Sequence, residues 1–402
     1  MLTVEEALEQ ILSRTPVLET ESVDVTGALG RILAEPVVSR REIPPWPNSS
    51  MDGYAIRAGD TLSGPARLRV VGHIAAGALP SRPIDAGEAA RIFTGAPLPE
   101  GADSVVPQED VAVEGDRVRV PGGVAKAAFV RPRGEDVRPG DHVLSPGQRL
   151  GPAEIGLLAT LGHSPVRVHR RPRVAVLSTG NELADLGIEP GPGQIPNTNT
   201  YSLMAQAWEA GAEPVNLGIA RDDLAAIEER VQWGRQADVL LSSAGVSVGE
   251  FDLVREALTR LGATLHLWQV SMRPGKPVTF GSLGRTLVFG LPGNPVSAMV
   301  TFEVFVRPAL LRMSGSTVLH RPRLTARALT PIRNPGHRRG YLRVRLQRRG
   351  DGFDAELTGD QGSAILRSMT LADGLAVVPG DTTVVAGDPV DVILLRALDL
   401  VG

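Results

Sequence analysis

The chain has 402 residues, enough for two to four domains, and its 42% hydrophobic and 22% charged content is ordinary for a globular protein. A net charge of −3 provides no basic field that would attract nucleic acid or an anionic membrane. The absence of cysteine excludes disulfides, thiolate metal sites and cysteine nucleophiles. No apolar run has membrane-spanning length and the N-terminus resembles no signal peptide, so we expect a cytoplasmic protein.

Two helices are predicted before the central part of the chain. Thr3 and Glu6 have the spacing of a capping box for a helix over residues 3–14. A second helix is expected over residues 152–162, ending at Gly162.

The segment between these helices predicts a small β-rich lobe. Residues 44–50, Pro-Pro-Trp-Pro-Asn-Ser-Ser, interrupt regular structure. Short alternating runs such as 68–71 and 117–120 follow, divided by glycine and proline, as is typical of short strands.

From about residue 173 the pattern alternates between strands and helices, which predicts a doubly wound parallel sheet. Four helices are expected, with these residues before or at their starts: Asn199, Asp222 with Asp223, Asp252, and Asn294 followed by Pro295. Beyond residue 316 the helical signal fades, and strict alternation over 342–346 indicates a small all-β domain.

Three apolar runs in the central part each lead into a turn of small residues, over 174–182, 239–249 and 287–295. Loops at the carboxyl ends of parallel strands are where α/β sheets bind ligands. The small side chains let backbone N–H groups approach an anion closely. Three such loops on one sheet indicate a large, phosphate-bearing ligand.

Six motifs, in one order along nearly the whole chain, resemble the molybdopterin molybdenumtransferase family, which includes the gephyrin E domain. The motifs are Ser50-Met-Asp-Gly-Tyr-Ala55, Thr94-Gly-Ala-Pro-Leu-Pro99 with Gly101-Ala-Asp103, Ser178-Thr-Gly-Asn-Glu182, Gly245-Val-Ser-Val-Gly249, Pro274-Gly-Lys-Pro277 and Leu291-Pro-Gly-Asn-Pro295. Any one of them is a weak signal, whereas six in order are highly specific.

The resemblance implies four lobes in a multidomain α/β plus β protein. These are a discontinuous N-terminal lobe over 1–45 and 140–172, a β-rich lobe over 46–139, a doubly wound molybdopterin-binding α/β domain over 173–315, and a C-terminal β-barrel over 316–402. It also implies a homodimer, with a molybdopterin-adenylylating protein as partner in the pathway.

The family reaction, as the resemblance implies, inserts molybdate into adenylylated molybdopterin and releases AMP with the help of Mg²⁺. The resemblance implies the following catalytic residues in this sequence: Asp52, Thr94, Arg131, Asp136, Glu182, Asp222, Asp252, Arg273 and Lys276. Asp52 and Glu182 are the expected metal ligands, because a hard cation takes carboxylate oxygen. The expected ligand-binding residues are Ser178, Thr179, Gly180, Ser243, Gly245, Ser247, Gly249, Pro292, Gly293, Asn294, Arg343 and Ser363.

Several of these residues have ordinary structural explanations. A carboxylate at a helix start often only caps the helix or complements its dipole, and this applies to Glu182, Asp222 and Asp252. We expect Arg131 to pair with Asp136. Arg343 lies in a run of arginines expected at the surface, although the resemblance implies that it and Ser363 reach the site from a partner subunit.

Two departures from the family pattern are relevant to activity. Arg273 and Gln269 stand where family members commonly carry lysine. Arg273 keeps the positive charge but on a planar guanidinium group, whereas Gln269 loses it. Two alternatives therefore remain beside the transferase. One is a scaffold that binds proteins at its dimer surface, and the other is an enzyme that adenylylates molybdopterin. The sequence does not distinguish molybdate from tungstate.

Overall fold

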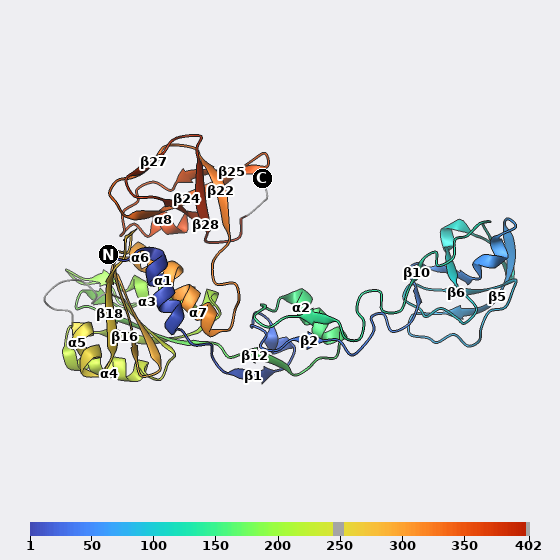
Figure 1. Ribbon diagram of the computed structural model, residues 1–402, viewed down its shortest axis with the longest axis horizontal. Helices are drawn as coiled ribbons and strands as arrows, with labels where there is room; N and C mark the ends of the chain where they lie inside the picture. Colours follow the sequence, from blue (N-terminus) through green and yellow to red (C-terminus); the bar gives the residue numbers. More distant parts are fainter. Residues whose placement is uncertain (244–252, 399–402) are drawn as a thin grey trace. The chain divides into compact units, whose positions relative to one another are not determined.

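The computed structural model describes residues 1–243 and 253–398, coloured along the chain in Figure 1. The chain divides into two compact units. The first holds residues 1–34, 146–155 and 164–402, and the second holds residues 35–145 and 156–163. Within the described ranges, no helix is both long enough and apolar enough to cross a membrane.

A six-stranded sheet is the centre of the first unit. Its strands, in spatial order, are β16 (Glu213–Ala220), β13 (Arg173–Thr179), β17 (Val239–Ser243), β21 (Thr286–Leu291), β20 (Pro277–Leu283) and β18 (Thr264–Gln269). The first four are parallel, as predicted, whereas β20 runs antiparallel to both of its neighbours. The sheet is therefore mixed, because a hairpin continues it beyond the parallel strands.

Helices cover both faces of this sheet, which confirms the predicted doubly wound arrangement. Alternate residues of β13 enter two different cores: Val174 and Val176 belong to one, and Ala175 and Leu177 to the other. The first core is completed by α1 (Val4–Arg14), α3 (Thr198–Glu209), α6 (Pro295–Thr301), a π-helical turn over Phe302–Val306 and α7 (Arg307–Met313). The second is completed by α4 (Leu224–Gly234) and α5 (Leu253–Arg260).

The N-terminal helix α1 forms as its capping box predicts. The Thr3 hydroxyl accepts from the Glu6 N–H at 3.2 Å, and the Glu6 carboxylate accepts from the Thr3 N–H at 2.7 Å. Its buried side chains, Val4, Ala7 and Ile11, join the core of the α/β domain. The helix thus packs on that domain, although the sequence analysis placed it in the discontinuous lobe.

Two of the predicted helix caps differ from expectation. Asn197, not Asn199, caps α3, and its side chain accepts from the Thr200 N–H, while Asn199 is buried in the first turn. Asn294 occupies the N-cap position of α6 but makes no side-chain capping hydrogen bond. Asp223 caps α4 as one of the two predicted aspartates, accepting from the Ala226 N–H at 2.8 Å.

The C-terminal domain is a closed five-stranded barrel, as predicted. Its strands, in order around the barrel, are β24 (Arg339–Arg349), β25 (Gly352–Leu357), β22 (Arg323–Ala328), β28 (Pro389–Leu394) and β26 (Gly374–Val378). The pairing of β26 with β24 closes the ring. The remaining elements are β23 (Ile332–Asn334), which pairs with β27 (Thr382–Val384), and α8 (Arg367–Thr370).

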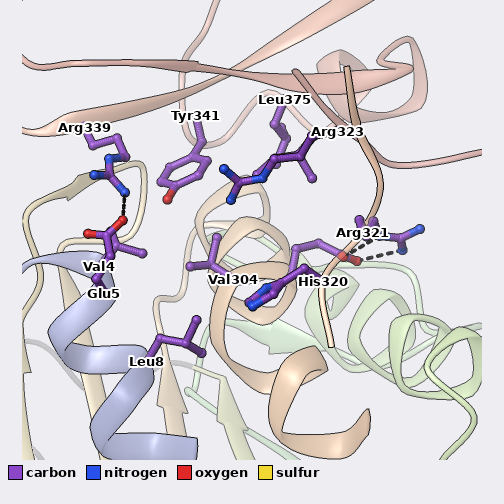
Figure 2. A pocket seen from close by; sticks show the side chains of 12 residues that line it. Val4, Glu5, Leu8, Val304, His320, Arg321, Arg323, Arg339, Tyr341 and Leu375 are labelled. Carbon is purple, nitrogen blue, oxygen red and sulfur yellow. Dashed lines mark hydrogen bonds and ion pairs between the residues drawn. The ribbon is translucent and has the colours of Figure 1, made fainter. Parts of the chain in front are cut away.

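The barrel is attached to the α/β domain within the first unit. The short strand β19 (Met272–Arg273) leads from the central sheet to pair with β24. Near the start of α1, Glu5 forms an ion pair with Arg339, and Figure 2 shows both side chains beside Tyr341 at a cavity of about 200 Å³.

A small β region completes the first unit. The strands β1 (Thr20–Val23) and β12 (Val166–His169) pair there, after which a short 3₁₀ turn covers Thr26–Ala28. The Gly30 N–H donates to the Leu150 carbonyl at 2.7 Å, and the Leu33 N–H donates to the Gln148 carbonyl at 2.9 Å. These bonds bring together segments far apart in the sequence, near residues 20–33 and 148–169.

The second unit contains a six-stranded sheet. Its strands, in spatial order, are β7 (Ser104–Pro107), β4 (Gly53–Ile56), β6 (Glu88–Ile92), β5 (Ala66–Ile74), β9 (Arg117–Val120) and β8 (Ala112–Glu114). Two small pairs accompany it, β3 (Asn48–Ser49) with β10 (Val130–Arg131) and β2 (Val37–Val38) with β11 (His142–Leu144). Short 3₁₀ turns cover Ala58–Thr61 and Gln108–Asp110, and helix α2 covers Pro152–Thr160.

Candidate functional site

The carboxyl ends of the parallel strands meet at one edge of the central sheet. β13 ends at Thr179, β17 at Ser243 and β21 at Leu291. Because β20 is antiparallel to β21, its first residues lie at this same edge, and Lys276 directly precedes them. The ends of the three strands, the loops after β13 and β21, and the Pro-Gly-Lys-Pro segment therefore lie at one edge of the sheet.

An open cavity of about 560 Å³ lies at this edge; we call it the edge cavity. Five of the predicted site residues line it: Thr179, Glu182, Ser243, Gly293 and Asn294. Ala364, the neighbour of the predicted Ser363, lines it as well. The short parallel pair β14 (Leu183–Ala184) and β15 (Ile195–Pro196) contributes further lining residues. The volume is within the range of a small-molecule site.

Asn199 links three elements at the edge cavity, and the sequence analysis gave it only a capping role. Its side-chain amide donates to the Ser243 hydroxyl at 2.7 Å and to the Gly293 carbonyl at 2.7 Å. A carbonyl can only accept, so this bond fixes which end of the amide is nitrogen. The remaining oxygen, Oδ1, is buried without a hydrogen-bond partner among the described residues. Asn199 therefore offers an unused acceptor in the wall of the cavity.

The signal for Asn199 was present in the sequence. The run Pro196-Asn-Thr-Asn-Thr200 holds two asparagines at one helix start, and a helix needs only one N-cap. Thr200 is buried as well, and its hydroxyl lies 2.7 Å from that of Ser178. Ser178 therefore supports the start of α3 from within the core and does not line the cavity.

Glu182 is exposed and lines the edge cavity. Its carboxylate lies over Gly180, where an added Cβ would come within 2.3 Å of Oε2. Gly180 also has φ = +143°, a conformation that favours glycine. Across the described parts of the chain, no hydrogen bond or ion pair engages this carboxylate. It is free to bind a cation or a ligand donor.

Asp222 has a clear structural role. Its carboxylate accepts from the Asn181 N–H at 3.1 Å, and its own N–H donates to the Asn181 side chain at 3.3 Å. This reciprocal pair joins the loop after β13 to the loop after β16. Asp222 therefore positions the segment that carries Gly180 and Glu182.

The barrel reaches the edge cavity through the loop that carries Ser363. The Asn294 side chain donates to the Ser363 hydroxyl at 2.9 Å, and the Val296 N–H donates to the Ser363 carbonyl at 3.1 Å. These contacts lie within one chain, and the expectation that Ser363 serves a site of the partner subunit stays a prediction.

Arg343 is fully buried in the barrel, which corrects its expected place in an exposed run. Its guanidinium donates to the Ser368 hydroxyl at 3.0 Å and to the Gly362 carbonyl at 3.1 Å. Burial lowers the pKa of Arg343 to about 10, and the positive charge of nearby Arg273 also lowers it. Arg343 therefore holds the loop that presents Ser363, and its Nη1 has no partner among the described residues.

Lys276 and Arg273 are both exposed near the start of β20. The Lys276 backbone is held by its carbonyl, which accepts from the Val270 N–H at 2.9 Å. Within the described ranges its ammonium has no partner. Arg273 makes one long contact, 3.5 Å from its Nη1 to the Pro335 carbonyl oxygen. Two cations at this edge are thus available to an anionic ligand.

Asp52 and Thr94 meet in the second unit. One carboxylate oxygen of Asp52 accepts from both the N–H and the hydroxyl of Thr94, at 2.8 and 2.7 Å. The Thr94 N–H, then its hydroxyl, and then the charge of Arg91 hold the pKa of Asp52 below its ordinary value. Among the described residues, the other carboxylate oxygen accepts no hydrogen bond. This pairing was not foreseen, since each residue was assigned a separate role.

The expected pairing of Arg131 with Asp136 is absent from the described residues. Arg131 lies in β10 opposite Asn48, and both Arg131 and Asp136 are exposed. The neighbouring Arg133 instead forms an ion pair with Glu42. The Arg-Pro-Arg-Gly-Glu-Asp segment thus holds its own unit together through Arg133.

Four predicted site residues, Gly245, Ser247, Gly249 and Asp252, lie outside the described residues. Pro292 is buried beneath the third loop. Within the described ranges no group of three or more His, Asp or Glu side chains is placed to hold a metal ion.

Family models match three consecutive parts of the chain. They are described as "MoeA N-terminal region (domain I and II)" for residues 2–162, "Probable molybdopterin binding domain" for residues 175–312 and "MoeA C-terminal region (domain IV)" for residues 325–395.

Relatives and solved structures agree with these matches. The molybdopterin molybdenumtransferase of Nostoc sp. is 39% identical, over 94% of this chain and 89% of the relative. Molybdopterin molybdenumtransferase 1 of Mycobacterium tuberculosis is 37% identical, over 98% and 99%. A crystal structure of a molybdopterin biosynthesis moeA protein from Pyrococcus horikoshii matches with a TM-score of 0.84 at 29% identity, over 98% of this chain and 100% of that one. The chain belongs to the molybdopterin molybdenumtransferase family.

Proposed function

We propose that this protein inserts molybdate into adenylylated molybdopterin and releases AMP, the last step of molybdenum cofactor biosynthesis. The observation that carries the proposal is the edge cavity, which is lined by residues of the first and third loops and by Glu182, whose carboxylate has no partner among the described residues. Lys276 and Arg273 lie near the start of β20, at the same edge of the sheet. The substrate is a pterin with a pyrophosphate, and such a ligand needs both polar cavity walls and positive charge. The relatives named molybdopterin molybdenumtransferase support the reaction class.

Different described residues have different roles in binding the substrate. Lys276 and Arg273 supply charge for the anionic groups, since no carboxylate of the described residues pairs with either cation. Asn199 supplies the unused acceptor Oδ1, which suits an N–H donor of the pterin ring. Asp222, Arg343 and Ser363 position these groups through the bonds that they make to the loops.

Mg²⁺ is part of the proposal, and the donors fit it. Mg²⁺ prefers oxygen ligands and often takes only one or two carboxylates together with phosphate oxygens and water. Glu182 presents a free carboxylate at the edge cavity, and Asp52 keeps one free oxygen. When bound, the ion would neutralise charge that develops on the pyrophosphate.

We also propose a cytoplasmic homodimer that receives its substrate from a molybdopterin-adenylylating protein. An adenylylated, phosphate-bearing substrate has to be made by an adenylyl-transferring enzyme. The mildly acidic chain, with a net charge of −3, gives no reason to expect nucleic-acid or membrane partners.

The test is to incubate the purified protein with adenylylated molybdopterin, molybdate and Mg²⁺ and to measure AMP. We expect AMP and active molybdenum cofactor to form together. Consumption of ATP with molybdopterin alone would instead assign the adenylylating activity. No AMP, together with recovery of a stoichiometric protein partner, would assign a scaffold.

A further inference from the structure

A second cavity, of about 260 Å³, lies away from the edge cavity; we call it the arginine cavity. Ala210 and Gly211 line it, at the C-terminal end of α3, whereas Asn199 lines the edge cavity at the start of that helix. A helix of this length spans about 18 Å. Five arginines line the arginine cavity, Arg31, Arg149, Arg170, Arg171 and Arg307, and no aspartate or glutamate lines it among the described residues.

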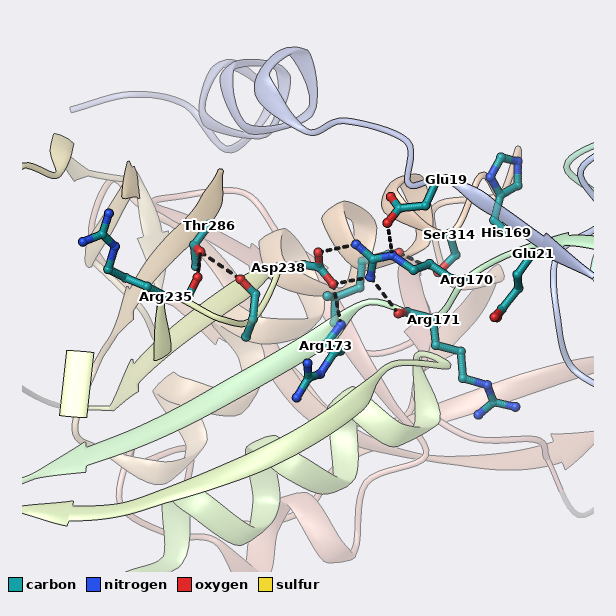
Figure 3. Close-up of polar contacts among 12 residues, drawn as sticks. Glu19, Glu21, His169, Arg170, Arg171, Arg173, Arg235, Asp238, Thr286 and Ser314 are labelled. Atoms are coloured by element: carbon teal, nitrogen blue, oxygen red, sulfur yellow. Dashed lines mark hydrogen bonds and ion pairs between the residues drawn. The ribbon is translucent and has the colours of Figure 1, made fainter. Parts of the chain in front are cut away.

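Two of the five arginines are neutralised by carboxylates. Arg170 donates to both oxygens of Asp238, at 2.6 and 2.7 Å, and to Glu19 at 2.7 Å, as Figure 3 shows. Arg31 forms an ion pair with Glu21 and donates to the His169 carbonyl at 2.8 Å. These two guanidinium groups need no further anion.

Arg149 and Arg171 are not neutralised. The guanidinium of Arg171 extends without a dashed contact in Figure 3. Arg149 lies against Gly30, with its Nη2 3.8 Å from the position of an added Cβ there. In the part of the chain that the structure describes, no carboxylate pairs with either guanidinium.

Of the five arginines, Arg307 gives the strongest evidence for an anion site, because it is a largely buried cation without an anionic hydrogen-bond partner. Only 13% of its side chain is exposed, and its Nε is buried without a hydrogen bond among the described residues. Glu303 Oε2 lies 3.9 Å from this Nε. Burial, followed by the charge of Arg321, lowers the pKa of Arg307, and Arg149 adds to the effect.

Glu303 gives Arg307 only a long ion pair of 3.9 Å, because its carboxylate is held by hydrogen bonds from other donors. Arg321 donates to the two Glu303 oxygens at 2.7 and 3.1 Å, and Gln206 donates at 2.9 Å. Figure 2 shows Arg321 in this contact, beside His320, which also lines the arginine cavity. A buried charge without a hydrogen-bonded partner is costly, and it favours binding of an anion from outside.

An alternative explanation is that the arginines only complement the C-terminal ends of α3 and α7, where carbonyl groups give a partial negative charge. That explanation predicts side-chain bonds to these carbonyls. Within the described residues, Arg149, Arg171 and Arg307 make none. It also leaves the buried Nε of Arg307 without a partner.

We propose that the arginine cavity binds a small phosphate-bearing anion. Guanidinium groups match phosphate oxygens with paired N–H donors. In the part of the chain that the structure describes, Arg149 and Arg171 pair with no carboxylate, and Arg307 reaches Glu303 only at 3.9 Å. The volume equals that of roughly nine water molecules in the liquid, so a phosphate with a small organic group or a second phosphate fits. The inference is independent of the reaction proposed for the edge cavity.

The experiment is a calorimetric titration of the full-length protein with inorganic phosphate and, separately, with inorganic pyrophosphate. Arg307→Met and Arg149→Gln should each weaken binding about tenfold to a hundredfold, as expected for loss of a charge-assisted hydrogen bond. Arg149 is exposed, so Arg149→Gln keeps the test valid if Arg307→Met fails to fold. Tighter binding of pyrophosphate would indicate a diphosphate or phosphoester ligand, and equal binding would indicate free phosphate.

Two control variants separate this cavity from others. Arg348→Gln removes an exposed barrel arginine outside the cavity and should leave binding unchanged. Lys276→Gln removes a cation at the edge cavity and should leave the phosphate site in the arginine cavity intact. The proposal is overturned if the wild type binds neither anion, or if Lys276→Gln abolishes binding that Arg307→Met and Arg149→Gln retain.

Discussion

At the scale of single residues, the edge cavity is marked by groups that the folded chain leaves unused. Asn199 Oδ1 is a buried acceptor without a donor, and the Glu182 carboxylate is free at the cavity wall. A fold without a ligand has no reason to keep a buried acceptor unpaired, since that costs free energy. We therefore expect these two side chains to contact the substrate.

Asn199→Ala tests the linking role of this side chain. The change removes both amide bonds and leaves the Gly293 carbonyl without its donor, so the free energy of unfolding should fall by about 1–3 kcal/mol. Denaturant unfolding measures it. Thr198→Ala, a change at the neighbouring residue with only a 3.4 Å contact to the Pro196 carbonyl, is the matched control and should cost less than about 0.5 kcal/mol. Equal effects of the two changes would contradict the linking role.

The Glu182→Gln variant tests whether the Glu182 carboxylate acts in the reaction without contributing to the stability of the fold. The carboxylate makes no bond within the described residues, so the amide should leave the melting temperature unchanged. The rate of AMP release should fall about a hundredfold or more, as for loss of one preorganised charge in an active site. Glu189→Gln, in the same exposed region, should keep full activity. Retained activity in Glu182→Gln would remove this residue from the mechanism.

The Asp52–Thr94 pair predicts a specific dependence on pH. The folded-state pKa of Asp52 lies below its ordinary value of 3.8, so its stabilising effect is complete above that value and is lost as pH falls through the lower, folded-state pKa. The wild type should therefore keep a constant thermal-stability advantage over Asp52→Asn above about pH 5 and lose it progressively between about pH 5 and about pH 2. Asp116→Asn, an exposed change in the same unit, should show no such loss. A constant advantage across this range would refute the assignment.

At the scale of elements, a glycine determines where Asp52 can sit. β4 starts at Gly53, and a Cβ there would lie 2.1 Å from the Val106 carbonyl oxygen of the paired strand β7. Gly53→Ala should therefore lower the stability of the second unit by about 1–3 kcal/mol or more, because backbone has to move. Gly59→Ala is the control, since no atom lies within 4 Å of its added Cβ. Differential scanning calorimetry distinguishes the two outcomes, and equal melting temperatures would be contrary to this prediction.

The elements also show what the sequence could and could not predict. The capping box located α1, and the three strands expected before the small-residue turns are present as β13, β17 and β21. The cap of α3 was misassigned because Asn197 and Asn199 are equally good cap residues in isolation. Which one enters the helix depends on the bonds from Asn199 to Ser243 and Gly293, and these partners are 44 and 94 residues away.

The burial of Arg343 also depends on contacts with residues distant in the sequence, which the sequence does not predict. It alternates with other arginines in β24, and a solvated face is the ordinary prediction for such a run. The barrel buries it because Ser368 and Gly362 receive its N–H groups. Contacts of this kind are set by the closure of the sheet and leave no local pattern.

At the scale of the whole molecule, order of motifs was more informative than any single motif. Six motifs spread from Ser50 to Pro295 indicated the family, and family models and relatives along most of the chain confirm it. The site residues, in contrast, fall into both compact units, with Asp52 and Thr94 in one and Glu182 and Lys276 in the other.

The homodimer is a prediction at this scale. Size-exclusion chromatography with light scattering should give twice the mass of the chain at micromolar concentration. Mixing two inactive variants, Asp52→Asn and Glu182→Gln, should restore part of the AMP release if the units of different chains combine in one site. A single-chain mass that persists on concentration would exclude the homodimer.

The most direct test of the central claim is the amount of AMP released per cofactor formed, measured with and without molybdate. The account predicts one AMP for each molybdenum cofactor from the wild type, with release dependent on molybdate and lost in Glu182→Gln. Absence of AMP from the folded wild type supplied with adenylylated molybdopterin, molybdate and Mg²⁺ would contradict it.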